Sequence, residues 1–399
     1  MGAINIKRTG SGSDIALSSD GTSLLLDGTA IGGGGGDPDL YRDNASSATT
    51  PVASGTNALA IGNTAVASGE NSFAIGSDTD ATGLNSLALG KGAQAVSTRC
   101  IAIGLNASAQ ADRSIAIGNN GNVANATYAT AIGSGSGGSG SEAHGSGSVA
   151  LSNSRTGGTD SLAAVIANNT SSYGATGANS VAIGQTSKAT SDGSVAIGKS
   201  CISNGGRTVA LGMMTTASGF YSFAVGALSE ALQDGSVCTG IRGKSDVQGK
   251  RVHSSSTFSA QIGNCQTGET VLGKETTDAT PAQLTSIPGN AASATNSITL
   301  PNNSCYGFTG TVIARENSAQ TNDFAVWEIK GGAVRAGSAS TTALGSYNIN
   351  KISESTGAAN WSIALSADTT NGAVAITVTG EASHSIRWVA TVNTTEVTY

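Results

Sequence analysis

Large apolar residues and small residues alternate in a short phrase that recurs along the first part of the chain. In residues 180–184 and 194–198 the phrase reads Ser-Val-Ala-Ile-Gly. Alternation with a period of two is typical of a β-strand, so the large residues point to one face and the small ones to the other. Elsewhere in the period, a Gly such as Gly69 is expected to supply the positive φ of a tight turn. The phrase therefore predicts a short strand followed by a turn.

The phrase recurs with a spacing of fourteen residues. Strict copies end at Gly62, Gly76, Gly90, Gly104, Gly118, Gly184, Gly198, Gly212, Gly226 and Gly240, with looser copies at 130–133, 148–152 and 161–166. A second short run, such as residues 64–67 before Gly69, follows in most periods. Two short strands and two turns leave no room for a helix. A fixed short period of this kind predicts a flattened parallel β-roll, a β-solenoid of about thirteen coils.

The alternation also predicts which side chains lie inside. We expect each coil to bury its large aliphatic residues in a small core. The face of Ala, Ser and Gly is then left for close approach by another chain, and self-association would cover it.

The repeat over residues 57–240 resembles the head repeat of the YadA-type trimeric autotransporter adhesins. The resemblance implies a left-handed parallel β-roll, a homotrimer packed side by side, and a rigid rod that projects from a surface. Such adhesins also carry a signal peptide, a coiled-coil stalk and an outer-membrane barrel. Residues 1–8 contain no apolar signal core and no stretch suits a stalk or barrel, so we expect synthesis in a host cytoplasm and assembly into a virion.

The sequence divides into four parts. Residues 1–55 combine short strands at 4–6, 15–17 and 23–26 with a Gly-rich hinge, and are predicted to form an N-terminal virion-attachment segment. Residues 56–240 form the roll, with loop insertions near 134–148 and 153–179. Residues 241–255 are a neck whose basic run from Arg242 to Arg251 is either solvated or holds an anion.

Residues 256–399 have a different pattern and hold all three tryptophans. Strand candidates lie at 258–262, 308–314, 324–329, 361–365, 374–378 and 386–392, with a hairpin turn at 368–372. This pattern predicts an antiparallel β-sandwich, here called the C-terminal domain. The motifs at 276–285, 311–315, 368–373 and 386–390 resemble a C-terminal domain of bacteriophage tail fibres, which implies a phage origin.

Composition and charge narrow the chemistry. With 56 Gly, 5 Pro and 12% charged residues, the fold class is all-β and rich in turns. A net charge of -6 favours neither a nucleic-acid partner nor membrane insertion. The three histidines are scattered and the five cysteines form no CxxC pair, so no catalytic, cofactor or metal site is expected. We therefore predict that the protein is not an enzyme, since coils this narrow cannot hold the carboxylate pair of a glycosidase.

Together these features predict a homotrimeric fibre of a bacteriophage virion. The N-terminus would bind other virion proteins, and the C-terminal domain would meet a host cell-surface glycan or protein. The candidate receptor-binding residues are Tyr306, Tyr347, Asn302 and Asn303, although each could equally serve packing or be plain surface. The alternatives are a capsid-decorating head fibre or spacer without a receptor, and then a polysaccharide depolymerase tailspike.

Overall fold

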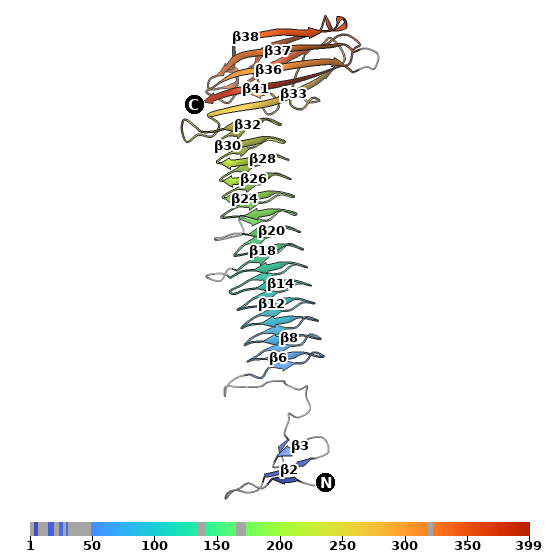
Figure 1. Cartoon of the computed structure of the whole chain (residues 1–399), viewed down its shortest axis with the longest axis vertical. Helices are drawn as coiled ribbons and strands as arrows, with labels where there is room; N and C mark the ends of the chain where they lie inside the picture. Colours follow the sequence, from blue (N-terminus) through green and yellow to red (C-terminus); the bar gives the residue numbers. More distant parts are fainter. Residues whose placement is uncertain are drawn as a thin grey trace. The chain divides into compact units, whose positions relative to one another are not determined.

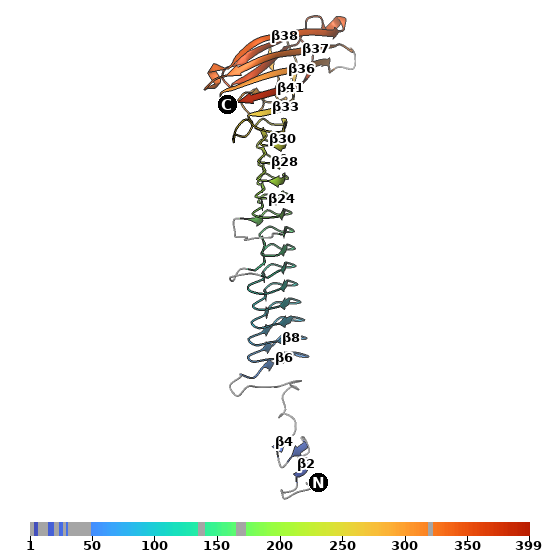
Figure 2. The ribbon, with the colours of Figure 1, turned by 60° about the vertical axis from the view of Figure 1, so that its left-hand side comes forward.

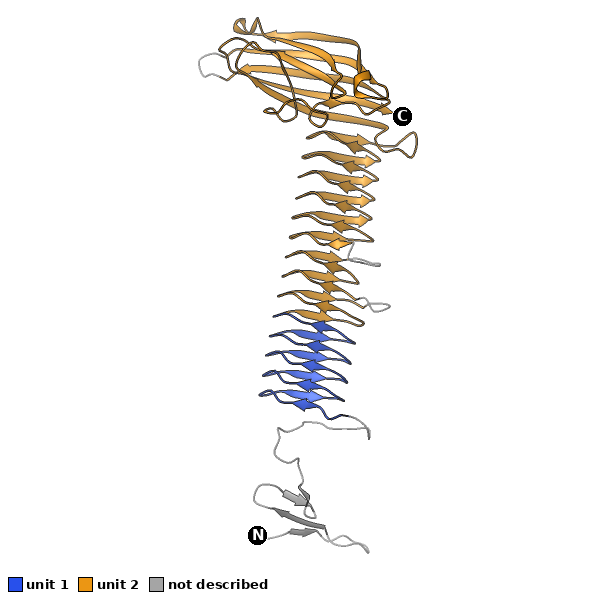
Figure 3. Cartoon of the chain, turned by 180° about the vertical axis from the view of Figure 1, so that it is seen from behind, with its two compact units in different colours: residues 1–113 blue, residues 114–399 orange. Residues whose placement is uncertain are grey.

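The computed structural model describes residues 49–134, 140–164, 173–317 and 322–399, together with four short N-terminal strands. These residues belong to two compact units, residues 1–113 and residues 114–399, which are coloured separately in Figure 3. The Gly-rich hinge predicted at residues 32–36 lies outside the described residues.

The N-terminal strands of unit 1 form a small antiparallel sheet. They are β1 (Ile4–Ile6), β2 (Ile15–Ser19), β3 (Leu24–Leu26) and β4 (Thr29–Ala30), paired in sequence order. The short strands expected in this segment are therefore confirmed.

The rest of unit 1 is a stack of coils with two strands each. The longer strands are β6 (Leu59–Ile61), β8 (Phe73–Ile75), β10 (Leu87–Leu89) and β12 (Ile101–Ile103). The shorter ones are β5 (Val52–Ala53), β7 (Val66–Ala67), β9 (Asp80–Ala81), β11 (Gln94–Ala95) and β13 (Ser108–Ala109). Each strand pairs in parallel with its equivalent one period away. The all-β solenoid is confirmed, with about 14 turns in the chain.

Unit 2 contains coils of the same pattern (Figures 1 and 2). Its longer strands are β14 (Ile115–Ile117), β16 (Thr130–Ile132), β18 (Val149–Leu151), β20 (Leu162–Ala164), β22 (Val181–Ile183), β24 (Val195–Lys199), β26 (Val209–Met213), β28 (Phe223–Ala227), β30 (Val237–Ile241) and β32 (Arg251–Ser254). Its shorter strands are β15 (Val123–Ala124), β17 (Glu142–Ala143), β19 (Arg155–Thr156), β21 (Gly174–Ala175), β23 (Lys188–Ala189), β25 (Ile202–Ser203), β27 (Thr216–Ala217), β29 (Glu230–Ala231) and β31 (Lys244–Ser245).

Two boundaries differ from those expected. The roll does not stop at Gly240, because β31 and β32 add a further turn of parallel pairing to β29 and β30. Most of the expected neck is thus a coil. The ranges expected as insertions, 134–148 and 153–179, also contain paired strands, with β17, β19, β20 and β21 keeping the parallel ladder.

The turns explain why the phrase closes on Gly. Gly62 has a φ of +123°, and a Cβ there would lie 2.3 Å from the carbonyl oxygen of Gly76 in the next coil. At the other turn Asn71 adopts a left-handed φ of 53°, and its amide both accepts from Asn57 at 3.0 Å and donates to Asn85 at 3.1 Å. Asn tolerates this conformation better than most residues. The fourteen-residue period therefore places Gly against Gly in a close backbone contact between coils, and Asn beside Asn in a ladder of side-chain hydrogen bonds.

The core of the roll is the reverse of the one expected. The small residues between the aliphatic ones are buried, with Ala74, Ala88, Ala182 and Ala196 all 0% exposed. The large residues on either side point outward, and Phe73 remains 44% exposed. The coils are too narrow for two layers of large side chains, so Ala fills them and the aliphatic residues form an outer stripe. The prediction that the small face is the outer one is wrong.

The C-terminal domain of unit 2 contains one large and one small antiparallel sheet. The large sheet has the order β33 (Cys265–Thr276), β41 (Ile386–Thr398), β36 (Ser304–Glu316), β37 (Phe324–Arg335) and β38 (Ala343–Glu354). In the small sheet, β40 (Ala373–Thr379) pairs with β34 (Ala282–Gln283), β35 (Ile298–Thr299) and β39 (Ser362–Asp368). Two short 3-10 helices, η1 (Ala339–Thr341) and η2 (Thr356–Ala358), flank β38. No described helix is long and apolar enough to cross a membrane.

One buried core joins the two sheets. It includes Trp327, Trp361 and Trp388, with the rings of Trp327 and Trp388 stacked at 5.7 Å between centroids. The hairpin turn expected at 368–372 is present, because Asp368 accepts backbone hydrogen bonds from Thr370 and Asn371. The structure describes residues 258–262, and they do not form the strand expected there. Phe258 is 76% exposed.

Candidate functional site

The outer face of the longer coil strands runs without a break into the large C-terminal sheet. The ladder continues through β32, which pairs in parallel with β30 and antiparallel with β33. One row of facing residues on this outer face is Val209, Phe223, Val237, Arg251, Glu269, Asn393, Thr309, Lys330 and Asn348. The row is apolar over the coils and becomes polar from Arg251 onward. The chemistry of the face therefore changes at the last coil.

A cleft of about 1080 Å³ lies on this polar part of the face. Strands β30 and β32 border it on one side, β38 borders it on the other, and the strands between them form its floor. Its lining is Val237, Thr239, Arg251, Val252, His253, Thr267, Gly268, Glu269, Gly307, Phe308, Thr309, Lys330, Gly331, Ser346, Tyr347, Asn348, Asn393, Thr394 and Thr395. A cleft of this size can hold a ligand of several rings.

One glycine hollows the floor of the cleft. Gly307 faces open space, since a Cβ built there would meet no atom within 4 Å. Gly331 faces the other side of the sheet, because a Cβ there would lie 2.7 Å from the Cβ of Tyr347 and 2.8 Å from the ring of buried Phe308. The register agrees, since Tyr347 pairs with Gly331 and Lys330 pairs with Asn348. The side chain of Tyr347 therefore leaves the sheet on the core side, opposite to that of Lys330.

The charged groups of the cleft are only loosely paired. Arg251 and Glu269 are 4.0 Å apart and largely exposed, so their attraction is weak. His253 shares a 3.0 Å hydrogen bond between its Nδ1 and the hydroxyl of Thr239. Lys330 makes no ion pair with any described residue. These groups can therefore turn to a ligand without first breaking a strong contact.

A second, smaller hollow of about 420 Å³ adjoins the cleft. It shares Thr309, Lys330, Asn348 and Asn393 with the cleft and adds Glu328 and Asn350. The two hollows give the outer face a continuous row of hydroxyl, amide and charged groups.

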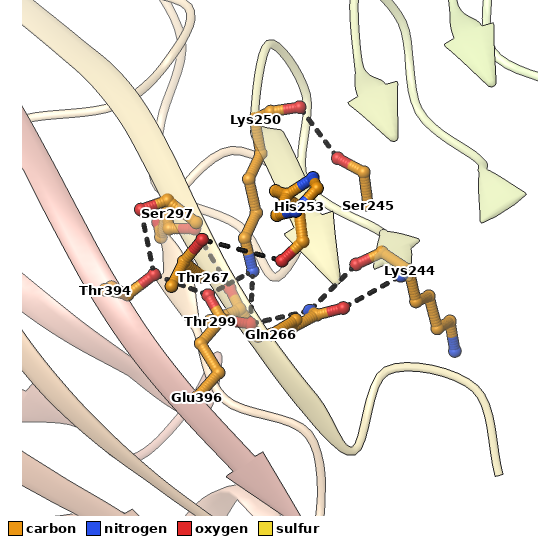
Figure 4. A network of polar contacts seen from close by, with 11 residues as sticks. Lys244, Ser245, Lys250, His253, Gln266, Thr267, Ser297, Thr299, Thr394 and Glu396 are labelled. Carbon is orange, nitrogen blue, oxygen red and sulfur yellow. Dashed lines mark hydrogen bonds and ion pairs between the residues drawn. The ribbon is translucent and has the colours of Figure 1, made fainter. Parts of the chain in front are cut away.

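A buried ion pair lies on the other side of the same sheet and joins the last coil to the C-terminal domain (Figure 4). The Nζ of Lys250 lies 2.7 Å from Oε1 of Glu396, and the two side chains are 3% and 0% exposed. The Nε2 of Gln266 donates to Glu396 at 2.7 Å, and the hydroxyl of Thr394 donates to it at 2.5 Å. The side chain of Gln266 also accepts a hydrogen bond from the backbone N–H of Lys244 and donates one to its carbonyl. The network therefore holds the last coil against β33 and β41.

Gly268 makes room for this pair. A Cβ at Gly268 would lie 2.6 Å from Oε1 of Glu396 and 2.7 Å from Cε of Lys250. Burial alone would raise the pKa of Glu396, but the Lys250 ammonium and the hydrogen bonds from Gln266 and Thr394 outweigh it and hold that pKa below its usual value. The carboxylate is therefore charged at neutral pH.

The predicted receptor-binding residues fall in different places. Tyr347 is 50% exposed and lines the cleft. Asn302 and Asn303 are exposed in the turn before β36, and Asn303 has a left-handed φ of 58°. Tyr306 is only 2% exposed, and Lys250 lies 5.4 Å above its ring. Burial raises the pKa of Tyr306 well above its usual value, and Tyr306 is core rather than a contact for a receptor.

Sequence reasoning missed most of the cleft. His253, Glu269, Lys330 and Asn393 are far apart in sequence and come together only through the sheet register. One signal was present, since the basic run at 242–251 was interpreted as a possible anion site. The structure divides that run, burying Lys250 against Glu396 and leaving Arg251 in the cleft.

The comparison with protein families supports the repeat found in the coils. Residues 53–79, 81–99, 101–120, 175–200 and 217–237 match the YadA head domain repeat. The repeat is therefore present, in stretches that together make up less than half of the chain. The matched stretches end at residue 237, before the C-terminal domain, so they give no support to its resemblance to phage tail fibres. No curated protein matches the chain.

Two solved structures show a distant likeness. The tailspike protein gp49 from Acinetobacter baumannii bacteriophage Fri1, a capsular polysaccharide depolymerase, is 10% identical over 81% of this chain and 57% of its own, with a TM-score of 0.25. The tailspike protein of Acinetobacter phage vB_ApiP_P1 is 12% identical over 88% of this chain and 80% of its own, with a TM-score of 0.20. The chain thus spans little more than half of the Fri1 tailspike.

These structures correct one expectation. The prediction that the protein is not an enzyme is contradicted, because the Fri1 tailspike is described as a depolymerase. We therefore do not retain that prediction. The low TM-scores mean that the likeness assigns no activity to this chain.

Proposed function

We propose that the protein is a homotrimeric fibre of a bacteriophage virion that attaches to the host cell surface through its C-terminal domain. The N-terminal segment would bind other virion proteins, and the two sheets of the C-terminal domain would act as a β-sandwich. The observation that carries the proposal is the outer face, which is apolar along the coils and polar and hollowed in the C-terminal domain.

The apolar part of the face supports self-association. Large side chains on the outer face are between 37% and 44% exposed within each unit, as Phe73 and Leu89 are in unit 1 and Ile197 and Phe223 are in unit 2. Extended exposed apolar stripes of this kind mark interaction surfaces, since covering them gains about 25 cal/mol for each Å². Packing against copies of the same stripe would cover it by a symmetric arrangement.

The polar part of the face supports binding. The cleft combines amides, hydroxyls and charged groups, which are the groups that hold a saccharide or a peptide. A trimer would present three such clefts, and avidity would multiply a weak single-site affinity.

Assembly is tested with a charge placed in the apolar stripe. In the Ile197→Asp and Val209→Asp double variant, light scattering should show the mass of one 38.9 kDa chain instead of three. The strands should keep their circular dichroism signal, because both side chains already face outward. Thr216→Asp, on the outer face of the shorter strands, is the control and should remain trimeric. A wild-type protein that is monomeric would refute the trimer.

Attachment is tested with the full-length chain on host cells. Labelled protein should bind cells and block phage adsorption, and the Gly307→Trp variant, which fills the cleft, should do neither. The chromatographic size of the host polysaccharide, followed in the same incubation, tests for cleavage. Binding to no cell, together with decoration of fibre-less particles, would instead establish a capsid-decorating fibre or spacer.

A further inference from the structure

We propose that the cleft binds an extended acidic saccharide. Its acid groups would face Arg251, His253 and Lys330, and its hydroxyl groups would face Asn393 and Thr309. This inference rests on the proposed function, because it names the ligand class of the site through which the fibre would attach.

The charge of the cleft points to an acidic ligand. Its lining holds two cationic side chains, Arg251 and Lys330, beside the imidazole of His253, and a single carboxylate, Glu269. The whole chain has the opposite balance, with 20 Lys and Arg against 26 Asp and Glu. A local excess of cations in an acidic protein attracts anions, and few carboxylates are near enough to repel them. A carboxylate that accepts a hydrogen bond from Arg or Lys also gains more than a neutral group would.

The spacing of the cations points to an extended ligand. The sheet register places Arg251 and Lys330 four strands apart, across Glu269, Asn393 and Thr309. At a strand spacing of roughly 4.8 Å, the two residues are separated by about 19 Å. A single acid group cannot contact both. A chain of several sugars with repeated acid groups can, and the amide of Asn393 and hydroxyl of Thr309 lie between the two cations for its hydroxyl groups.

The neutral groups between the cations point to a sugar rather than to a free anion. The amides of Asn393 and Asn348 and the hydroxyl of Thr309 belong to the same outward row as Arg251 and Lys330. Amides and hydroxyls both donate and accept hydrogen bonds, which suits the hydroxyl groups of a pyranose. A single phosphate could contact few of them at once.

The cleft would also stay open in an assembled fibre. Copies packed along the stripe gain by covering Val209 and Phe223, but the row continues through Val237, at the edge of the cleft, to Arg251 and Glu269. Covering these charges without a strong partner costs free energy. Close contact between chains is therefore expected to end at the last coil, beside the cleft.

The test is calorimetric titration of the full-length protein with a panel of acidic polysaccharide fragments. The probes are oligomers of polygalacturonate, hyaluronan and polysialic acid, each beside its carboxyl-reduced, neutral counterpart. At least one acidic oligomer should bind, its neutral counterpart should bind at least tenfold more weakly, and the corresponding monosaccharide should bind more weakly still. Lys330→Ala and Arg251→Ala should each weaken binding about tenfold or more, the loss of one charged hydrogen bond.

A matched pair of variants places the binding in the cleft. Gly307→Trp should abolish it without unfolding, because the new side chain enters open space. Gly337→Trp is the control and should bind like the wild type, since it also meets no atom within 4 Å but lies outside the cleft lining. Light scattering and a thermal melt on both variants check that assembly and folding are intact.

Failure of this inference can be told apart from failure of the proposed function. If no acidic oligomer binds, if the neutral forms bind equally well, or if Gly307→Trp still binds, the acidic-saccharide site is refuted. If the fibre nevertheless binds host cells and loses that binding with Gly307→Trp, the attachment function stands with a different ligand. If it binds neither cells nor oligomers, both proposals fail.

Discussion

Removing one partner of the buried pair between Lys250 and Glu396 should destabilise unit 2 strongly. Lys250→Met leaves a carboxylate that is 0% exposed without its 2.7 Å cationic partner. Stranding a buried charge in this way costs about 3–5 kcal/mol of the free energy of unfolding at neutral pH. Adding Glu396→Gln removes the charge and keeps an acceptor for Gln266, so the double variant should recover at least about 2 kcal/mol of that loss.

The pH dependence gives this prediction a second test. In the wild type the pKa of Glu396 lies below its usual value, so the pair stabilises the fold fully above the unfolded pKa, near 4.3, and the contribution is lost as the pH falls through the folded value. In Lys250→Met, burial is no longer outweighed and raises that pKa. The variant then loses stability as the pH rises through the raised value. The difference between the two proteins should therefore be largest near pH 7 and should shrink toward pH 4.

Urea unfolding followed by tryptophan fluorescence provides the measurement, since all three tryptophans lie in the core of the C-terminal domain. Protein concentration is held fixed because assembly shifts apparent stability. Arg251→Met is the control, because its 4.0 Å pair with Glu269 is exposed and should contribute at most about 1 kcal/mol. A loss below about 1 kcal/mol for Lys250→Met at pH 7, or a loss that does not change with pH, would show that the pair does not hold the last coil to the domain.

Three further predictions concern the coils and the thiols. Gly198→Ala should lower the free energy of unfolding by about 2 kcal/mol or more, because φ is +130° and the new Cβ would lie 1.8 Å from a carbonyl oxygen of the next coil. Gly289→Ala is the control: its Cβ would meet no atom within 4 Å, so it should leave the melting temperature unchanged in the same thermal melt. Ala210→Leu should cost about 1–3 kcal/mol by overfilling the narrow core, and a neutral result would mean that the coil can expand. Burial raises the pKa of Cys238 to about 11, so at pH 8 a thiol reagent should label exposed Cys305 long before Cys238, and equal rates in the native protein would contradict this.

The coils could be predicted because each fourteen-residue period repeats the same residue types at the same positions. Gly62 and Asn71 mark the turns by residue type, and alternation marks the strands. Pairing follows from the period itself, since every strand meets its own copy one coil away. The repeat would also have predicted the extra turn at β31 and β32, had the basic residues there not obscured the pattern.

The C-terminal domain could be predicted only in part. Apolar alternation found the segments around β36, β37 and β41, whose inner residues are buried. It missed β33 and β38, because β33 is rich in Thr, Gly and Glu and β38 is exposed over most of its length. Tyr306 could not be distinguished from Tyr347 by sequence, since both follow polar loop residues and only packing buries the first.

The sequence by itself determined the solenoid, its period, its turns and the change of fold near residue 255, because these depend on local residue types and on a spacing that can be counted. Only the tertiary structure decided which face of the coil is the inside. Alternation separates two faces but does not say which is buried, and the narrow width of the coil selects Ala over Val and Ile. The cleft likewise depends on the register of neighbouring strands, which brings Arg251, Asn393 and Lys330 to one surface from distant parts of the chain.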